Sequence, residues 1–193
     1  MKKILSLLIF ITLLTVRNSQ AQSFDLGILD NAMSMIKSGN NNNKVAAILG
    51  DAVMSLKDEV VQSQTSFAPK LLSQVTALAG LIPSIKKGNV DLTLVQKIIS
   101  TVKTLVAAQR LKGLLSGGSL SGKGSEVGNN VNLLKSGMSL LGGGSSVDKL
   151  SKTLNMVGKK SGKLDKSGMF ASMAQKAIGK KLGSSLNLLS GLI

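Results

Sequence analysis

Apolar residues recur every three or four positions through most of this chain, which is the spacing of helices that bury one face. In the first half the spacing predicts helices over residues 28–36, 45–60, 69–82 and 92–115. No strand-like alternation persists anywhere. The pattern therefore predicts an all-α fold in which residues 22–116 form a small, irregular helical bundle.

Residues with strong local preferences mark the expected ends of these helices. Gly39 and the asparagines after it end the first helix, and Pro69 suits the first turn of the third. Pro83 is expected to stop that third helix, because proline has no N–H to donate. Asp91 is expected to cap the fourth helix, and Gly117 to end it.

The second half has a different texture, because 16 of the 21 glycines lie in residues 110–193. Glycine loses more backbone entropy on ordering than other residues do, so helices here are expected to be marginal. Weaker apolar stripes cover residues 127–141, 147–157 and 170–189, and Ser145 with Asp148 is expected to form a capping box for the middle one. These features predict a flexible Gly/Ser-rich segment with a weak helix over 117–146, followed by a cationic amphipathic helical region over 147–193.

The start of the chain has the three-part layout of an export signal. Lys2 and Lys3 precede an apolar run over 4–16, and a short polar stretch follows it. The run has 13 residues, whereas a membrane-spanning helix needs about 20. We therefore expect residues 1–21 to be removed by cleavage between Ala21 and Gln22. The mature chain would be periplasmic or secreted, and without cysteine it has no disulfides and no lipoprotein anchor.

Positive charge is concentrated in the second half of the chain. Residues 110–193 hold 13 basic residues against three acidic ones, Glu126, Asp148 and Asp165, which gives a net charge of +10. Outside the cytoplasm such a surface would attract anionic lipid, lipopolysaccharide or an envelope protein. The alternative is that the lysines only keep a leucine-rich segment soluble.

The helix expected over residues 170–189 is the best candidate for a binding surface. A cationic amphipathic helix can lie in an anionic membrane interface with its lysines at the headgroups, so the protein would be peripheral on a membrane. The alternatives are that the same apolar face packs on the protein core, or that leucine-rich faces drive self-association. The residues expected to contact the membrane or another anionic surface are Phe170, Met173, Lys176, Ile178, Lys180, Lys181 and Leu182.

The residue inventory argues against catalysis and against nucleic-acid binding. Without histidine or cysteine, no Ser-His-Asp triad, Cys-His pair or histidine-based metal site can form. The basic segments lack aromatic side chains for base stacking, and Arg110 is the only arginine of the mature chain. Asp58 and Glu59 are interpreted as surface charges. We therefore expect no enzyme activity, no catalytic residue, no cofactor, no metal and no nucleic-acid partner.

Two weak motifs remain. The first is Ser-x-x-Lys, the spacing of a serine nucleophile in penicillin-binding proteins, which leaves a Ser-Lys hydrolase as an alternative function although the companion motifs of those proteins are missing. The second is the run 117–124, which has the spacing of a phosphate-binding P-loop until Gly124 replaces its final Ser or Thr; a linker is the favoured interpretation. The Ser-x-x-Lys pairs are Ser34–Lys37, Ser84–Lys87, Ser100–Lys103 and Ser146–Lys149.

Overall fold

The described part of the chain is helical throughout. The computed structural model describes residues 23–39, 41–138 and 144–193, so the predicted leader and the cleavage site between Ala21 and Gln22 lie outside it. Within these ranges there are α-helices and one 3₁₀ turn but no strand, which confirms the all-α fold class. The elements are α2 (Gly27–Lys37), α3 (Asn42–Val61), α4 (Ala68–Lys86), α5 (Leu92–Ser116), α6 (Gly124–Met138), α7 (Ser145–Ser161), η1 (Gly162–Asp165) and α8 (Met169–Leu192).

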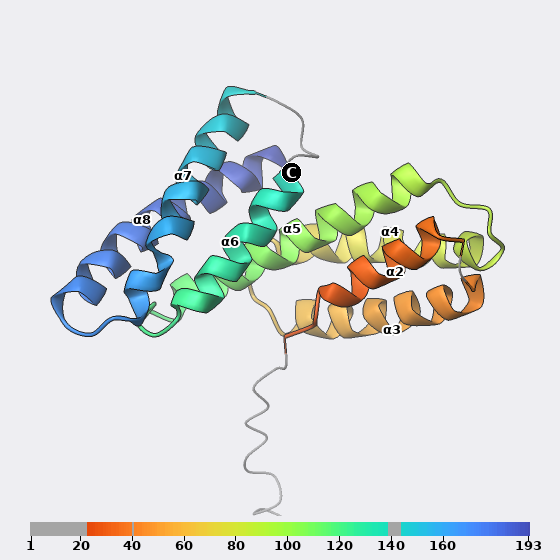
Figure 1. Ribbon diagram of the computed structural model, residues 1–193, viewed down its shortest axis with the longest axis horizontal. Coiled ribbons are helices and arrows are strands. Elements are labelled where there is room, and N and C mark those ends of the chain that lie inside the picture. Colours follow the sequence, from red (N-terminus) through yellow and green to blue (C-terminus); the bar gives the residue numbers. More distant parts are fainter. Residues whose placement is uncertain (1–22, 40, 139–143) are drawn as a thin grey trace, which may run out of the picture.

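Helix α5 is shared by two groups of helices (Figure 1). On one side α2 and α4 pack against α5, and α3 packs on both of them; on the other side α6 and α8 pack against α5, and α7 packs on both of these. Lys70 of α4 donates a hydrogen bond of 2.6 Å to the carbonyl of Ser190 in α8, which ties the two groups directly. The two groups therefore form one small, irregular bundle around a common helix.

The sequence of α5 suits this central position, because its apolar residues are spread around the helix instead of forming one stripe. A helix that is apolar on most sides is stable only where neighbours cover it on most sides. Ala107 and Ala108, near its middle, are fully buried. The buried apolar residues of α5 are Val95, Ile98, Ile99, Val102, Leu105, Val106, Ala107, Ala108 and Leu111.

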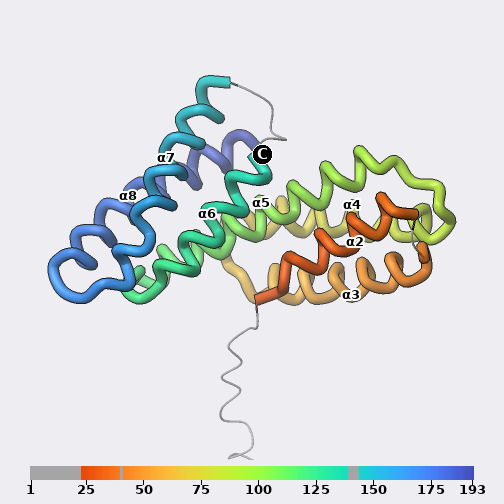
Figure 2. The backbone as a smooth tube through the Cα atoms, viewed as in Figure 1, coloured from red at the N-terminus to blue at the C-terminus, as the bar shows by residue number. Residues whose placement is uncertain are grey.

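Each helix also packs against the helix that follows it in the chain. This holds for every consecutive pair of α-helices from α2 to α8, and the smooth change of colour along the tube in Figure 2 lets the reader follow it. Short connections favour this arrangement, because two helices joined by a few residues are held close to one another. The bundle is therefore built mainly from neighbours in sequence.

Several of the expected helix ends are confirmed. The Asp91 carboxylate accepts hydrogen bonds from the backbone N–H of Thr93 at 2.8 Å and of Leu94 at 3.2 Å, so it caps α5. Pro69 lies in the first turn of α4, and Gly117 is the C-cap that follows the last residue of α5, Ser116. The capping box expected of Ser145 and Asp148 is wrong, because α7 begins after Gly144 without a side-chain cap.

The expectation that Pro83 stops its helix is also wrong, since α4 continues to Lys86 with Pro83 inside it. Proline removes its own N–H, but its carbonyl still accepts, here from the N–H of Lys87 at 3.2 Å. Pro83 lies in the last turn and is exposed, so water can satisfy the carbonyl left without a partner. Continuing the helix buries Ile85, which favours the longer form.

Some glycines of α6 lie where two helices approach each other closely. A Cβ added to Gly137 of α6 would lie 3.0 Å from the Thr104 Cβ and 3.3 Å from the Ser100 carbonyl oxygen, both in α5. One added to Gly128 of α6 would lie 3.0 Å from the Ser161 hydroxyl in α7. Much of the segment expected to be a flexible stretch with a weak helix is therefore the packed helix α6, while 139–143 lie outside the described residues.

The hydroxyl of Ser185 is buried without a hydrogen-bond partner among the described residues; this side chain lies in α8 and is 1% exposed. We expect Ser185→Ala to raise the free energy of unfolding by about 1 kcal/mol, because the change removes an unpaired buried hydroxyl and improves helix propensity. Urea unfolding would measure it. The neighbouring Ser184 is exposed and donates to the Lys180 carbonyl, so Ser184→Ala is the control, with an expected change within about 0.5 kcal/mol. A lower stability of Ser185→Ala would contradict the prediction.

Candidate functional site

The apolar face predicted for the C-terminal helix is divided in the structure. Ile178 and Leu182 are buried in the core, where α8 packs against α5 and α7. Lys181 is half-buried beside them. In the folded protein, Ile178 and Leu182 are therefore not accessible to a membrane or another surface. At these two residues the apolar face packs on the protein core, as the alternative interpretation of the sequence predicted.

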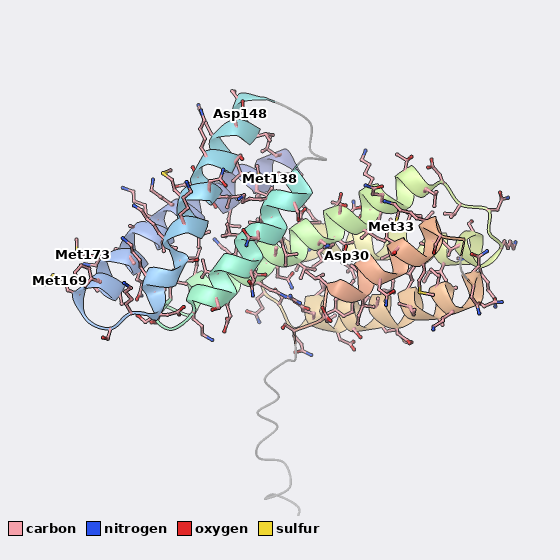
Figure 3. All side chains as sticks on the ribbon, in the orientation of Figure 1. Asp30, Met33, Met138, Asp148, Met169 and Met173 are labelled. Carbon is pink, nitrogen blue, oxygen red and sulfur yellow. The ribbon has the colours of Figure 1, made fainter. Side chains whose placement is uncertain are left out.

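The first turns of α8 differ, because their apolar side chains project into solvent. Met169 is 77% exposed, Phe170 73% and Met173 64%. Figure 3 shows Met169 and Met173 at the extreme end of the molecule, next to the turn that joins η1 to α8. We call these three residues the α8 tip. Phe24 and Phe67 are buried, so Phe170 is the one exposed aromatic side chain of the described residues.

Lysines are frequent in the sequence on both sides of the α8 tip and along α7. Residues 145–193 contain nine lysines and two aspartates, which is a net charge of +7. Eight of these lysines are exposed, and none of the nine forms an ion pair within the part of the chain that the structure describes. The exposed ones are Lys149, Lys152, Lys159, Lys160, Lys163, Lys166, Lys176 and Lys180.

The nearest acidic side chain, Asp165, is engaged in a structural contact. Its carboxylate accepts a hydrogen bond of 2.8 Å from the backbone N–H of Gly124, the first residue of α6. This bond satisfies one of the N–H groups that have no partner at a helix start. The two aspartates of residues 145–193 offset only part of the charge of the nine lysines. The predicted contacts Lys176 and Lys180 lie on the exposed face of α8 together with Met173.

The P-loop-like run 117–124 joins α5 to α6, and its backbone is tied to η1 and α8. The N–H of Gly122 donates to the Leu164 carbonyl at 2.9 Å, and the Gln175 side chain donates to the Gly118 carbonyl at 3.1 Å. The Asp165 carboxylate occupies the position at the start of α6 where a phosphate would bind in a P-loop. The segment is therefore a connection with a structural role.

One of the Ser-x-x-Lys pairs, Ser100 and Lys103, lines a cavity of about 110 Å³ between α5 and α6. The Lys103 ammonium forms an ion pair with both carboxylate oxygens of Asp30, at 2.6 and 2.7 Å. A lysine that acts as the base for a serine must offer a free amine to the hydroxyl. The ion pair with Asp30 joins α5 to α2, so the Lys103 ammonium takes part in a structural contact.

The sequence interpretation missed a cluster at the start of the described chain. Arg110 in α5 binds both carboxylate oxygens of Glu59 in α3 at 2.8 Å, and it also donates to the Phe24 carbonyl at 2.6 Å. The Phe24 N–H in turn donates to Glu59 at 3.1 Å. The interpretation of Glu59 as a surface charge is therefore wrong, since both side chains are largely buried. The only signal in the sequence was that Arg110 is the one arginine of the expected mature chain, which otherwise uses lysine.

A cavity of about 590 Å³ adjoins this cluster, between the end of α5 and the start of α6. Its charged groups are compensated, because Arg110 is paired with Glu59 and Lys123 is paired with Glu126 at 2.8 Å. Its wall also contains Asn129 and Asn130 together with the apolar residues Leu114 and Leu133. The cavity therefore offers no unbalanced charge that would orient an ionic ligand.

Across residues 23–39, 41–138 and 144–193, no helix is both long and apolar enough to cross a bilayer, and no group of three or more acidic side chains is placed to hold a metal ion. No protein-family model matches the chain, and comparisons with curated proteins and with solved structures found no match.

Proposed function

We propose that this protein is exported and acts without catalysis, as a peripheral protein that binds anionic membrane surfaces through the α8 tip and the lysines around it. The observation that supports the proposal most strongly is the exposure of Met169, Phe170 and Met173 at one end of a bundle whose other large apolar side chains are mostly buried. Lys166 and Lys176, which form no ion pair with any described residue, lie three residues before and after the α8 tip in the sequence and supply complementary charge. An apolar projection with a basic border suits an interface of acyl chains and anionic headgroups.

The expected energies show why both features are needed. Burying one Phe or Met side chain contributes about 1.5–3 kcal/mol, and each lysine close to an anionic surface adds about 1 kcal/mol. Either contribution alone gives weak attachment. Together the three apolar side chains and a few lysines give reversible binding that depends on both lipid charge and salt.

The main competing occupant of the α8 tip is another copy of this chain, since exposed apolar groups also drive self-association. Charge favours the membrane, because two copies would bring together surfaces that each carry a net charge of +7 over residues 145–193. Lipopolysaccharide carries the same kind of anionic headgroup as an acidic lipid. An envelope protein, by contrast, is absent from protein-free vesicles, so vesicle binding separates the two.

The test is co-sedimentation of the chain from Gln22 onward with vesicles that contain phosphatidylglycerol, compared with vesicles of phosphatidylcholine alone. We expect binding to the anionic vesicles that weakens from 0.1 M to 1 M salt, as the Debye length falls from about 10 to about 3 Å. The triple variant Met169→Ser, Phe170→Ser, Met173→Ser should bind at least tenfold more weakly. These side chains are exposed, so the variant is expected to keep its fold, and circular dichroism would verify this.

Matched controls come from the other group of helices. Met54 and Val61 are also exposed apolar residues, in α3, so the double variant Met54→Ser, Val61→Ser should bind as the parent does. Lys176→Glu with Lys180→Glu should abolish binding at low salt, whereas Lys86→Glu with Lys87→Glu should reduce it much less.

Equal binding to both vesicle types, or sedimentation of the protein without vesicles, would refute the proposal and in the second case indicate self-association. Removal of α8 would be a poor test, because it removes the buried residues Ile178 and Leu182.

A further inference from the structure

Two of the three residues of the α8 tip are methionines, and their thioethers are among the most exposed in the described chain. Met169 is 77% exposed and Met173 64%, whereas Met33 and Met138 are buried in the core. Methionine sulfur is oxidised where an oxidant can reach it, and the product is a polar sulfoxide. The two methionines are one helical turn apart, so both belong to the same small surface.

We propose that Met169 and Met173 are oxidation sites whose modification releases the protein from membranes; this inference rests on the proposed function. The oxidant is a hydroperoxide. The sulfur attacks the terminal peroxide oxygen, the O–O bond breaks, and one oxygen atom is transferred to sulfur. The sulfur is oxidised by two electrons, and the peroxide is reduced to water or an alcohol.

The structure explains why this modification would affect binding and leave the fold intact. The side chains of the α8 tip project into solvent, so a sulfoxide there breaks no core contact. At the membrane, however, two of the three apolar side chains would become strongly polar. Phe170 and the lysines would remain, and they provide only part of the interaction. Binding should therefore fall by about tenfold or more while the helical content stays constant.

The experiment treats the chain from Gln22 onward with hydrogen peroxide at increasing times, maps oxygen addition by peptide mass spectrometry and measures binding to phosphatidylglycerol vesicles. We expect Met169 and Met173 to be oxidised before Met33 and Met138, and binding to fall in step with them. Methionine sulfoxide reductase should restore binding. Circular dichroism should not change.

Two variants make the result specific. Met169→Leu with Met173→Leu keeps the α8 tip apolar but cannot be oxidised there, so peroxide should leave its binding at the level that the same variant shows untreated. Met54→Leu removes an exposed methionine in α3, 59% exposed, and should leave the peroxide sensitivity unchanged. Loss of binding by the double Leu variant on oxidation would overturn the inference, and so would full binding by the oxidised parent. If the untreated parent does not bind anionic vesicles, the proposed function fails and this inference falls with it.

Discussion

Replacing Gly137 by alanine should destabilise the protein by about 2–3 kcal/mol, and replacing it by valine should cost more. The added Cβ would meet the side chain of Thr104, which is almost fully buried and donates a hydrogen bond of 2.8 Å to the Ser100 carbonyl. Thr104 could move only by breaking that bond, and the backbone oxygen of Ser100 blocks the other side. Overpacking at such a contact forces α5 and α6 apart.

Urea unfolding followed by circular dichroism measures this effect, and Gly80→Ala is the matched control. Gly80 lies inside α4 with open space where a Cβ would go, so alanine there should stabilise the protein by about 0.5–1 kcal/mol through helix propensity. The variant Thr104→Ala should recover part of the loss when it is combined with Gly137→Ala. If Gly137→Ala is as stable as the parent, the close contact between α5 and α6 is not a feature of the protein in solution.

Replacing Arg110 by leucine should lower the free energy of unfolding by about 3 kcal/mol. The change leaves the Glu59 carboxylate largely buried without its counter-charge. Removing one partner of a buried ion pair is strongly destabilising, because the remaining charge is not compensated. It also removes the bond to the Phe24 carbonyl. The amide proton of Phe24 should therefore exchange faster, which NMR hydrogen exchange would detect alongside urea unfolding.

Two comparisons define what the Arg110 result means. The double variant Glu59→Leu, Arg110→Leu should be more stable than Arg110→Leu alone, because no buried charge is left unpaired. The Lys103–Asp30 pair is the exposed counterpart, with the Asp30 side chain 63% exposed, so Asp30→Asn should cost less than about 1 kcal/mol. If Arg110→Leu and Asp30→Asn lower the free energy of unfolding by similar amounts, burial of the Glu59–Arg110 pair does not increase the cost of breaking it.

Local sequence signals were sufficient for much of the fold. The three-to-four spacing placed the helices of the first half, and Asp91 and Gly117 marked the two ends of α5, because these signals depend on neighbouring residues only. Pro83 was misjudged because the burial of Ile85, a tertiary effect, outweighs the missing N–H. The glycines of α6 were taken as a sign of weak helices, although Gly137 is placed where α5 comes close.

The candidate site depended more on tertiary structure. Phe170, Met173, Lys176 and Lys180 were chosen from the pattern and are exposed, while Ile178 and Leu182 came from the same stripe and are buried. A helical stripe shows which residues share a face but not where a neighbouring helix ends. The pairing of Glu59 with Arg110 joins residues 51 positions apart, so no local pattern could reveal it.

The packing of each helix on its successor also bears on how quickly the chain can fold. Most native contacts in such an arrangement close short loops, and proteins with low contact order fold in microseconds to milliseconds. The hydrogen bond from Lys70 to Ser190 joins residues 120 positions apart, so we expect it to form late in folding. A protein that crosses a membrane unfolded, as the proposed export implies, would hide its leucine-rich faces soon after emerging. The order of helices along the chain thus limits the time in which the chain could aggregate.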